Sequence, residues 1–204
     1  VGNLAHAIKT PLSVIVNEAA AHSPDVFANK VLEQADVMRG QLAHHLERAR
    51  IAARVTTVVA VTEVAPVIEA LRRTMEKIHR GRGIAIEAKA DPRAKFRGER
   101  QDLEEMVGNL VDNACKWAAS QVRVSAAAAG AFLILTVEDD GPGLTPDEIV
   151  RVLEKRERLD ETVPGSGLGL GIVRDIAVLY GGRLELDRSA DLGGLAARLT
   201  LPLA

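Results

Sequence analysis

Apolar residues recur at two different periods along this chain of 204 residues, and the change of period divides it into two parts. In residues 1–58 the apolar positions lie three or four residues apart, which is typical of helices. The segment His22–Asp25 contains Ser and Pro and interrupts this pattern, so we expect one helix on each side of it. In the second helix, mostly apolar residues recur in alternate steps of four and three, as in a coiled-coil seam: Val31, Ala35, Met38, Leu42, His45, Ala49 and Ala52.

A hairpin of two such helices cannot bury its whole seam alone, and its many small residues make a thin core. We therefore expect residues 1–58 to form a homodimer, in which two helical hairpins build a four-helix bundle.

Residues 59–204 mix helical periods with the alternation of strands. Helices are predicted at about residues 64–79, 99–118, 146–153 and 168–180. Strands are predicted near residues 84–88, 121–127, 131–138, 183–188 and 195–201. This order, with one hairpin-like pair of strands, predicts an α/β sandwich in which helices cover one face of a mixed sheet. The fold class is therefore α+β, a helical hairpin followed by a sandwich domain.

Composition narrows the classes of function. The net charge is −2, so no overall basic field indicates a nucleic-acid partner. Cys115 is the only cysteine, which excludes an internal disulfide and any zinc site built from cysteines. No apolar run approaches the roughly 18 residues of a membrane helix, so we expect no membrane contact by this segment. The chain opens inside a helical pattern without an initiator Met, and we expect it to be a fragment of a longer protein.

Three carboxamide and ammonium groups are predicted to share one face of the helix at 99–118. Asn109, Asn113 and Lys116 are spaced by four and three residues. Amide oxygens suit Mg²⁺, and amide NH₂ groups and an ammonium suit phosphate oxygens, so the stripe fits a metal-bound polyphosphate. A solvated polar stripe is the alternative.

Two glycine-rich segments follow. Asp139-Asp140-Gly141-Pro142-Gly143 ends an apolar strand, where a buried carboxylate could accept the exocyclic amine of adenine and glycines would let the backbone approach a flat ring. A plain turn is the alternative. Gly165–Gly171 opens a helix and exposes backbone N–H groups to a phosphate. It could also be a flexible loop, but a dinucleotide loop is excluded because the charged segment 155–162 before it is no strand.

These three elements, in this order, resemble the N, G1 and G2 boxes of the histidine kinase ATP-binding domain, part of the gyrase–Hsp90–kinase–MutL superfamily. Leu4-Ala5-His6-Ala7-Ile8-Lys9-Thr10-Pro11-Leu12 resembles the H box of the dimerisation and phosphoacceptor domain. The similarity runs over nearly all of the chain. The amino-acid sequence resembles the PhoQ-like branch of the family at residues 108–116, 137–143 and 158–160.

The resemblance implies a role for each matching residue. His6 would be the phosphoacceptor, Thr10 would position water during dephosphorylation of a partner, and Arg158 would be a lid cation near the γ-phosphate. Asn109 would bind Mg²⁺, and Asp139 would read adenine. The remaining nucleotide contacts would come from Asn113, Lys116, Gly141, Gly143, Gly165, Gly167 and Gly169.

The implied function is that of a two-component sensor histidine kinase. Such a kinase uses ATP and Mg²⁺ to phosphorylate its own His6, passes the phosphoryl group to an Asp of a response regulator, and can act as its phosphatase. Hydrolysing branches carry a Glu where this chain has Asn109, and an amide cannot take a proton from water. The full-length protein would be anchored in the bacterial inner membrane, with this part on the cytoplasmic side.

The chain departs from the family's pattern at Ala7, where Glu or Asp is usual, at Leu153 in place of Phe, and at Arg156 in place of Gly. Trp117 could flank the adenine or be an ordinary core or surface aromatic. Two other functions compete: a dimeric phosphotransfer adaptor that has lost ATP, and a mechanical ATPase of the same superfamily. The intact nucleotide motifs argue against the first, and the H box and Asn109 argue against the second.

Overall fold

The computed structural model describes residues 60–153 and 169–204, together with helical residues at 15–16, 27, 30–31, 34–35 and 38. The chain divides into two compact units, Val1–Arg54 and Val55–Ala204. Among the described residues no helix is both long and apolar enough to cross a membrane.

The second unit holds a five-stranded sheet in the order β2-β4-β5-β7-β6. Its strands are β2 (Ala85–Ala90), β4 (Gln121–Ala129), β5 (Phe132–Asp139), β6 (Arg183–Arg188) and β7 (Leu195–Pro202). The pairing of β2 with β4 is parallel, and the other three pairings are antiparallel. The predicted mixed sheet is therefore confirmed.

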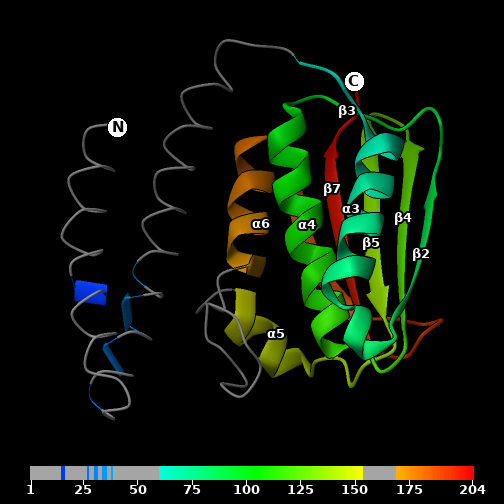
Figure 1. The fold of residues 1–204 in the computed structure, drawn as a ribbon. Helices are drawn as coiled ribbons and strands as arrows, with labels where there is room; N and C mark the ends of the chain where they lie inside the picture. The colour runs from blue at the N-terminus through cyan, green and yellow to red at the C-terminus, as the bar shows by residue number, and fades with distance from the viewer. Residues whose placement is uncertain are drawn as a thin grey trace. The chain divides into compact units, whose positions relative to one another are not determined.

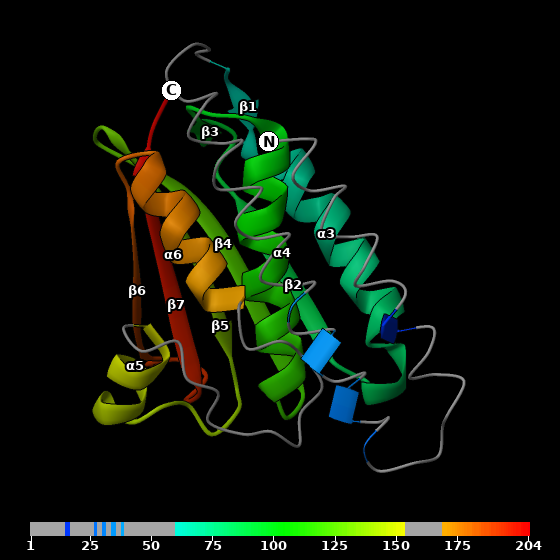
Figure 2. The same ribbon diagram turned by 90° about the vertical axis from the view of Figure 1, so that its left-hand side faces the viewer.

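Helices α3 (Val64–Ile78), α4 (Arg100–Trp117) and α6 (Gly169–Leu179) lie side by side over one face of this sheet (Figures 1 and 2). α5 (Pro146–Leu153) lies beyond one end of α6 (Figure 1). The apolar face of α4 recurs at helical spacing, and its buried residues include Leu103, Met106, Leu110 and Ala114. Opposite them, alternate residues of β5 are buried. The core thus lies between the helical layer and the inner face of the sheet.

Two short strands and one short helix were not predicted. β1 (Thr62–Glu63) and β3 (Lys95–Phe96) pair with each other in a separate two-stranded sheet, and the 3-10 turn η1 covers Arg80–Arg82. Two-residue strands carry no readable alternation, so their pairing arises only in the folded chain.

Candidate functional site

Asp139 is buried because it continues the alternation of β5. Leu133, Leu135 and Val137 point to the inner face of the sheet, and Asp139, two residues further, is 2% exposed. Its Oδ1 accepts hydrogen bonds from the backbone N–H groups of Gly141 at 2.9 Å and Leu195 at 3.2 Å. Burial raises the pKa of Asp139, and these two bonds offset that only in part. Both bonds end on Oδ1, so Oδ2 is the oxygen left to accept a bond from a ligand.

Glycines allow three backbone segments to meet around this carboxylate. A Cβ added at Gly141 would lie 2.4 Å from the carbonyl oxygen of Trp117 and 2.9 Å from Oδ1 of Asp139. A Cβ at Gly194 would lie 2.3 Å from the same Oδ1. Gly143 has a φ of 72°, which favours glycine, and lies against the backbone of Gly194. The surroundings of Asp139 are therefore backbone groups packed too closely for any side chain.

Sequence reasoning missed Gly194. It sits in the turn between β6 and β7, and its N–H donates to the backbone oxygen of Asp139 at 3.1 Å. The pair Gly193-Gly194 reads as an ordinary turn, and the contact with Asp139 spans a long stretch of sequence, so no local signal marks it.

Asp140, the next residue, has a structural role instead. Its carboxylate accepts bonds from the backbone N–H groups of Ala119, Ser120 and Gln121 and from the Ser120 hydroxyl. Burial opposes ionisation of Asp140, but these bonds outweigh it and lower its pKa to about 2. The two adjacent carboxylates therefore have different roles. Asp140 holds the connection between α4 and β4, whereas Asp139 is held through Oδ1 by Gly141 and Leu195 and keeps Oδ2 outside those bonds.

The predicted polar face lies on α4. Asn109 donates from Nδ2 to the carbonyl oxygen of Glu105 at 2.8 Å, which fixes its amide and leaves Oδ1 as the free acceptor. A Cβ added at Gly169, the first residue of α6, would lie 3.1 Å from that Oδ1. The start of α6 therefore borders Asn109 in the middle of α4, while the loop after Asp139 borders Trp117 at the C-terminal end of α4. One helix connects the parts of the three predicted motifs that the structure describes.

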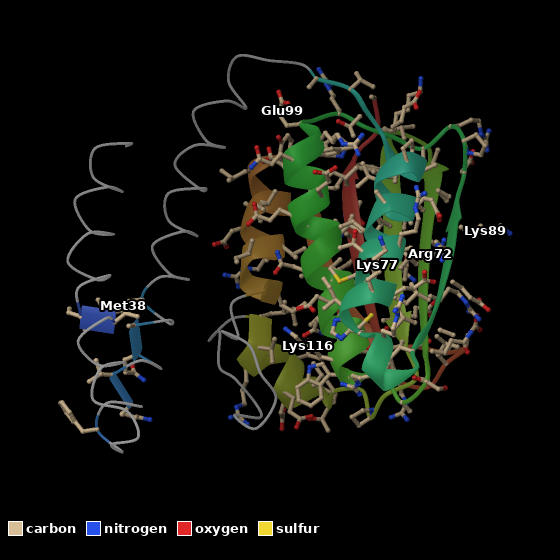
Figure 3. The ribbon with its side chains drawn as sticks, viewed as in Figure 1. Met38, Arg72, Lys77, Lys89, Glu99 and Lys116 are labelled. Atoms are coloured by element: carbon tan, nitrogen blue, oxygen red, sulfur yellow. The ribbon has the colours of Figure 1, made fainter. Side chains whose placement is uncertain are left out.

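Lys116 lies near the C-terminal end of α4 (Figure 3). Its Nζ lies 2.6 Å from Oδ2 of Asp112, one turn earlier on the helix. The other oxygen of Asp112 lies 3.0 Å from Nε2 of His79, which follows α3. His79 and Asp112 were not predicted as part of the site, because a lone His and an Asp inside a helix give no signal until the fold brings them together.

Other predicted residues fall outside the described part of the chain: His6, Thr10, Arg156, Arg158, Gly165 and Gly167. Cys115 is fully buried, and burial raises the pKa of its thiol to about 11, as expected of a small core residue. Among the described residues no group of three or more His, Cys, Asp or Glu side chains could hold a metal ion. An amide oxygen such as that of Asn109 could contribute one ligand to a metal that a bound molecule also coordinates.

Known proteins match the chain in sequence and in structure. Residues 98–204 match the family described as histidine kinase-, DNA gyrase B-, and HSP90-like ATPase. The sensor protein kinase CarS of Pseudomonas aeruginosa is 44% identical over 99% of this chain, and the two-component sensor PhoQ of the same species is 36% identical over 97% of it. This chain spans 45% of the length of each of those relatives.

A solved structure extends the match. The mycobacterial sensor histidine kinase MprB superposes with a TM-score of 0.60 and 32% identity, over 72% of this chain and 98% of the MprB chain. The sequence relatives include PhoQ proteins, as the sequences of the motifs predict.

Proposed function

The chain belongs to the histidine kinase-, DNA gyrase B- and HSP90-like ATPases, and on that premise we propose that it is the catalytic part of a two-component sensor histidine kinase. It transfers the γ-phosphoryl group of ATP to its own His6, and then to an Asp of a response regulator. We assign residues 1–58 to the phosphoacceptor hairpin and residues 59–204 to the ATP-binding domain.

The observation that carries this proposal is the environment of Asp139. A buried carboxylate with one oxygen held by two backbone donors presents its second oxygen as an acceptor in a fixed place. The exocyclic amine of adenine is a donor of matching chemistry, and the close backbone packing that Gly141 and Gly194 permit holds the carboxylate in place. Burial also raises the pKa of Asp139. A carboxylate perturbed in this way is typical of a binding site and not of a surface turn.

The polyphosphate end of the site lies along α4 and the start of α6. Asn109 has its amide NH₂ engaged and its oxygen free, which fits a ligand to Mg²⁺. Asn113 and Lys116 follow on the same face, and the N-terminus of α6 supplies backbone N–H groups. Together with Arg158 and the glycines at 165 and 167, these groups would bind phosphate oxygens. Mg²⁺ held there would supply positive charge against the phosphates, and this chain's residues would orient them.

His6 supplies the nucleophile. An imidazole with an ordinary pKa of about 6.5 is mostly neutral at pH 7 and needs little activation. The amide at Asn109 cannot deprotonate water, so ATP is kept for His6 rather than hydrolysed. Thr10, four residues after His6 in the sequence, would position water when the same protein dephosphorylates its response regulator.

The partners follow from the helical hairpin. Ile15 is 47% exposed and Met38 is 52% exposed in the single chain, which supports burial of these large apolar side chains in a homodimer through residues 1–58. The receiver domain of a response regulator is the second partner. We place this part of the chain on the cytoplasmic side of the bacterial inner membrane, with the anchor in a part of the full-length protein beyond this sequence.

Autophosphorylation with labelled ATP tests the proposal. The wild-type chain should gain acid-labile label with Mg²⁺, and His6→Gln should gain none while binding ATP as the wild type does. Label retained by His6→Gln would contradict the assignment of the phosphoacceptor. A wild type that does not bind ATP would contradict the function itself and favour a phosphotransfer adaptor.

A further inference from the structure

His79 lies just after α3 and reaches across to α4. Its Nε2 lies 3.0 Å from Oδ1 of Asp112, whose Oδ2 lies 2.6 Å from Nζ of Lys116. An ionised carboxylate only accepts hydrogen bonds, so Nε2 of His79 donates in this contact. The side chain of His79 is 11% exposed, against 33% for Asp112 and 29% for Lys116. A mostly buried imidazole therefore supports a half-exposed ion pair.

A second contact holds the same end of α4. Arg82 donates through its guanidinium to the backbone oxygens of Lys116 and Ala118, where a cation is favoured at a helix C-terminus. The backbone N–H of Arg82 donates to the carbonyl oxygen of His79 at 2.9 Å, so both residues belong to one tight turn. The turn from His79 to Arg82 therefore fixes both the carboxylate that holds the Lys116 ammonium and the backbone that carries Lys116.

This arrangement matters because a lysine is a flexible ligand. A free lysine side chain has many rotamers, and binding a phosphate oxygen would require it to give up that freedom. Here the ammonium is already confined by Asp112, and Asp112 is itself confined by His79. Groups that are ordered before binding lose less entropy when the ligand arrives.

We infer that His79 is a positioning residue for the nucleotide phosphates, acting through Asp112 to hold Lys116 in place. This inference rests on the proposed function, because the position of Lys116 matters only if the chain binds a polyphosphate. His79 does not touch the nucleotide in this account. Its effect should therefore grow with the number of phosphates on the ligand and vanish for adenosine.

The test compares ATP with adenosine on the whole chain, with binding followed by NMR titration so that weak affinities are measurable. His79→Leu keeps much of the buried volume and removes the donor, whereas the amide NH₂ of Gln can replace Nε2 in His79→Gln. We expect His79→Leu to bind ATP about fivefold more weakly, a fraction of the strength of a hydrogen bond to a charged group. Adenosine affinity should be unchanged, and His79→Gln should restore most of the ATP affinity.

Two further variants make the result decisive. Lys77→Leu, an exposed change in the last turn of α3, should bind both ligands as the wild type does. Lys116→Ala should lose ATP affinity and keep adenosine affinity. The inference is overturned if His79→Leu weakens ATP and adenosine equally, which would mark a purely structural residue, or if it weakens neither while Lys116→Ala weakens ATP. A wild type that bound no ATP would instead overturn the proposed function, and this inference with it.

Discussion

The two ends of the candidate nucleotide site are built from different materials. Around Asp139 the protein uses backbone: two N–H groups hold one carboxylate oxygen, and Gly141 and Gly194 allow the chain segments to touch. Along α4 it uses side chains that are partly exposed, with Lys116 already engaged by Asp112. The tightly packed backbone of the first end tolerates few substitutions. At the second end, Lys116 can exchange the carboxylate of Asp112 for a phosphate oxygen. We therefore expect changes at Asp139 to weaken adenosine binding. Changes along α4 should leave adenosine binding intact and alter ATP affinity or phosphoryl transfer.

The largest effect is expected at Asn109. Asn109→Ala removes the amide oxygen proposed to bind Mg²⁺, whose charge is needed most as the phosphoryl group moves. Phosphorylation at saturating ATP should slow by about a hundredfold, the effect of removing one stabilising group from a transition state. Adenosine affinity should stay near that of the wild type. Single-turnover labelling measures the phosphorylation rate, and a titration measures the adenosine affinity. An equal loss of rate and of adenosine affinity would contradict the difference between the two ends of the site.

The next effect is expected at Gly194. A Cβ there would lie 2.3 Å from Oδ1 of Asp139 and 2.6 Å from the backbone nitrogen of Gly141, so backbone must move. Gly194→Ala should weaken adenosine binding by about fiftyfold, equivalent to roughly 2 kcal/mol of misplaced packing.

Gly193→Ala is the matched control. Its φ of 85° makes any side chain strained, but no atom lies within 4 Å of the added Cβ. It should cost stability, about 1 kcal/mol, and little adenosine affinity. Equal losses of affinity in the two variants would show that the turn as a whole, and not the contact with Asp139, governs binding.

A somewhat smaller loss is expected for Asp139→Asn. The N–H groups of Gly141 and Leu195 require an acceptor, so the amide oxygen should take the place of Oδ1 and turn its NH₂ toward the ligand. A donor would then face the adenine amine, and adenosine affinity should fall about twentyfold.

The same variant should unfold at a higher temperature than the wild type. Burial raises the pKa of Asp139, so its ionised form opposes folding at neutral pH and a neutral amide removes that cost. Calorimetry at pH 7 checks this expectation. A lower melting temperature would contradict the expectation that the ionised carboxylate opposes folding.

The smallest effect on nucleotide affinity is expected at Asp140, which differs from Asp139 in acting on stability. Because the fold lowers the pKa of Asp140 to about 2, its contribution to stability is complete above the unfolded pKa of about 3.9 and is lost as the pH falls toward 2. Asp140→Asn should therefore be less stable than the wild type at pH 7, and the difference should shrink between pH 4 and pH 2. Nucleotide affinity at pH 7 should change little. A stability difference independent of pH would contradict this account.

The sequence predicts the regular elements of the second unit well, because each carries a period of its own. The alternation in residues 131–138 predicts β5, and the spacing of Asn109, Asn113 and Lys116 predicts their common face on α4. What it could not predict depends on pairs that are distant in sequence. Gly194 acquires its role only from contact with Asp139, and His79 only from contact with Asp112. The assignments to His6 and Arg158 stay predictions, since both lie outside the described residues.

The position of β7 in the sheet has a consequence for protein synthesis. β7 lies between β5 and β6, and Leu195, its first residue, donates to the carboxylate of Asp139. A nascent chain that has been translated only as far as β6 would hold Asp139 without this donor and would expose the edge of β5, a hydrogen-bonding edge open to wrong partners. The proposed adenine end therefore cannot assemble until β7 has left the ribosome. A half-made chain would therefore lack the complete environment of Asp139, and the proposed nucleotide site would form only once the domain is complete.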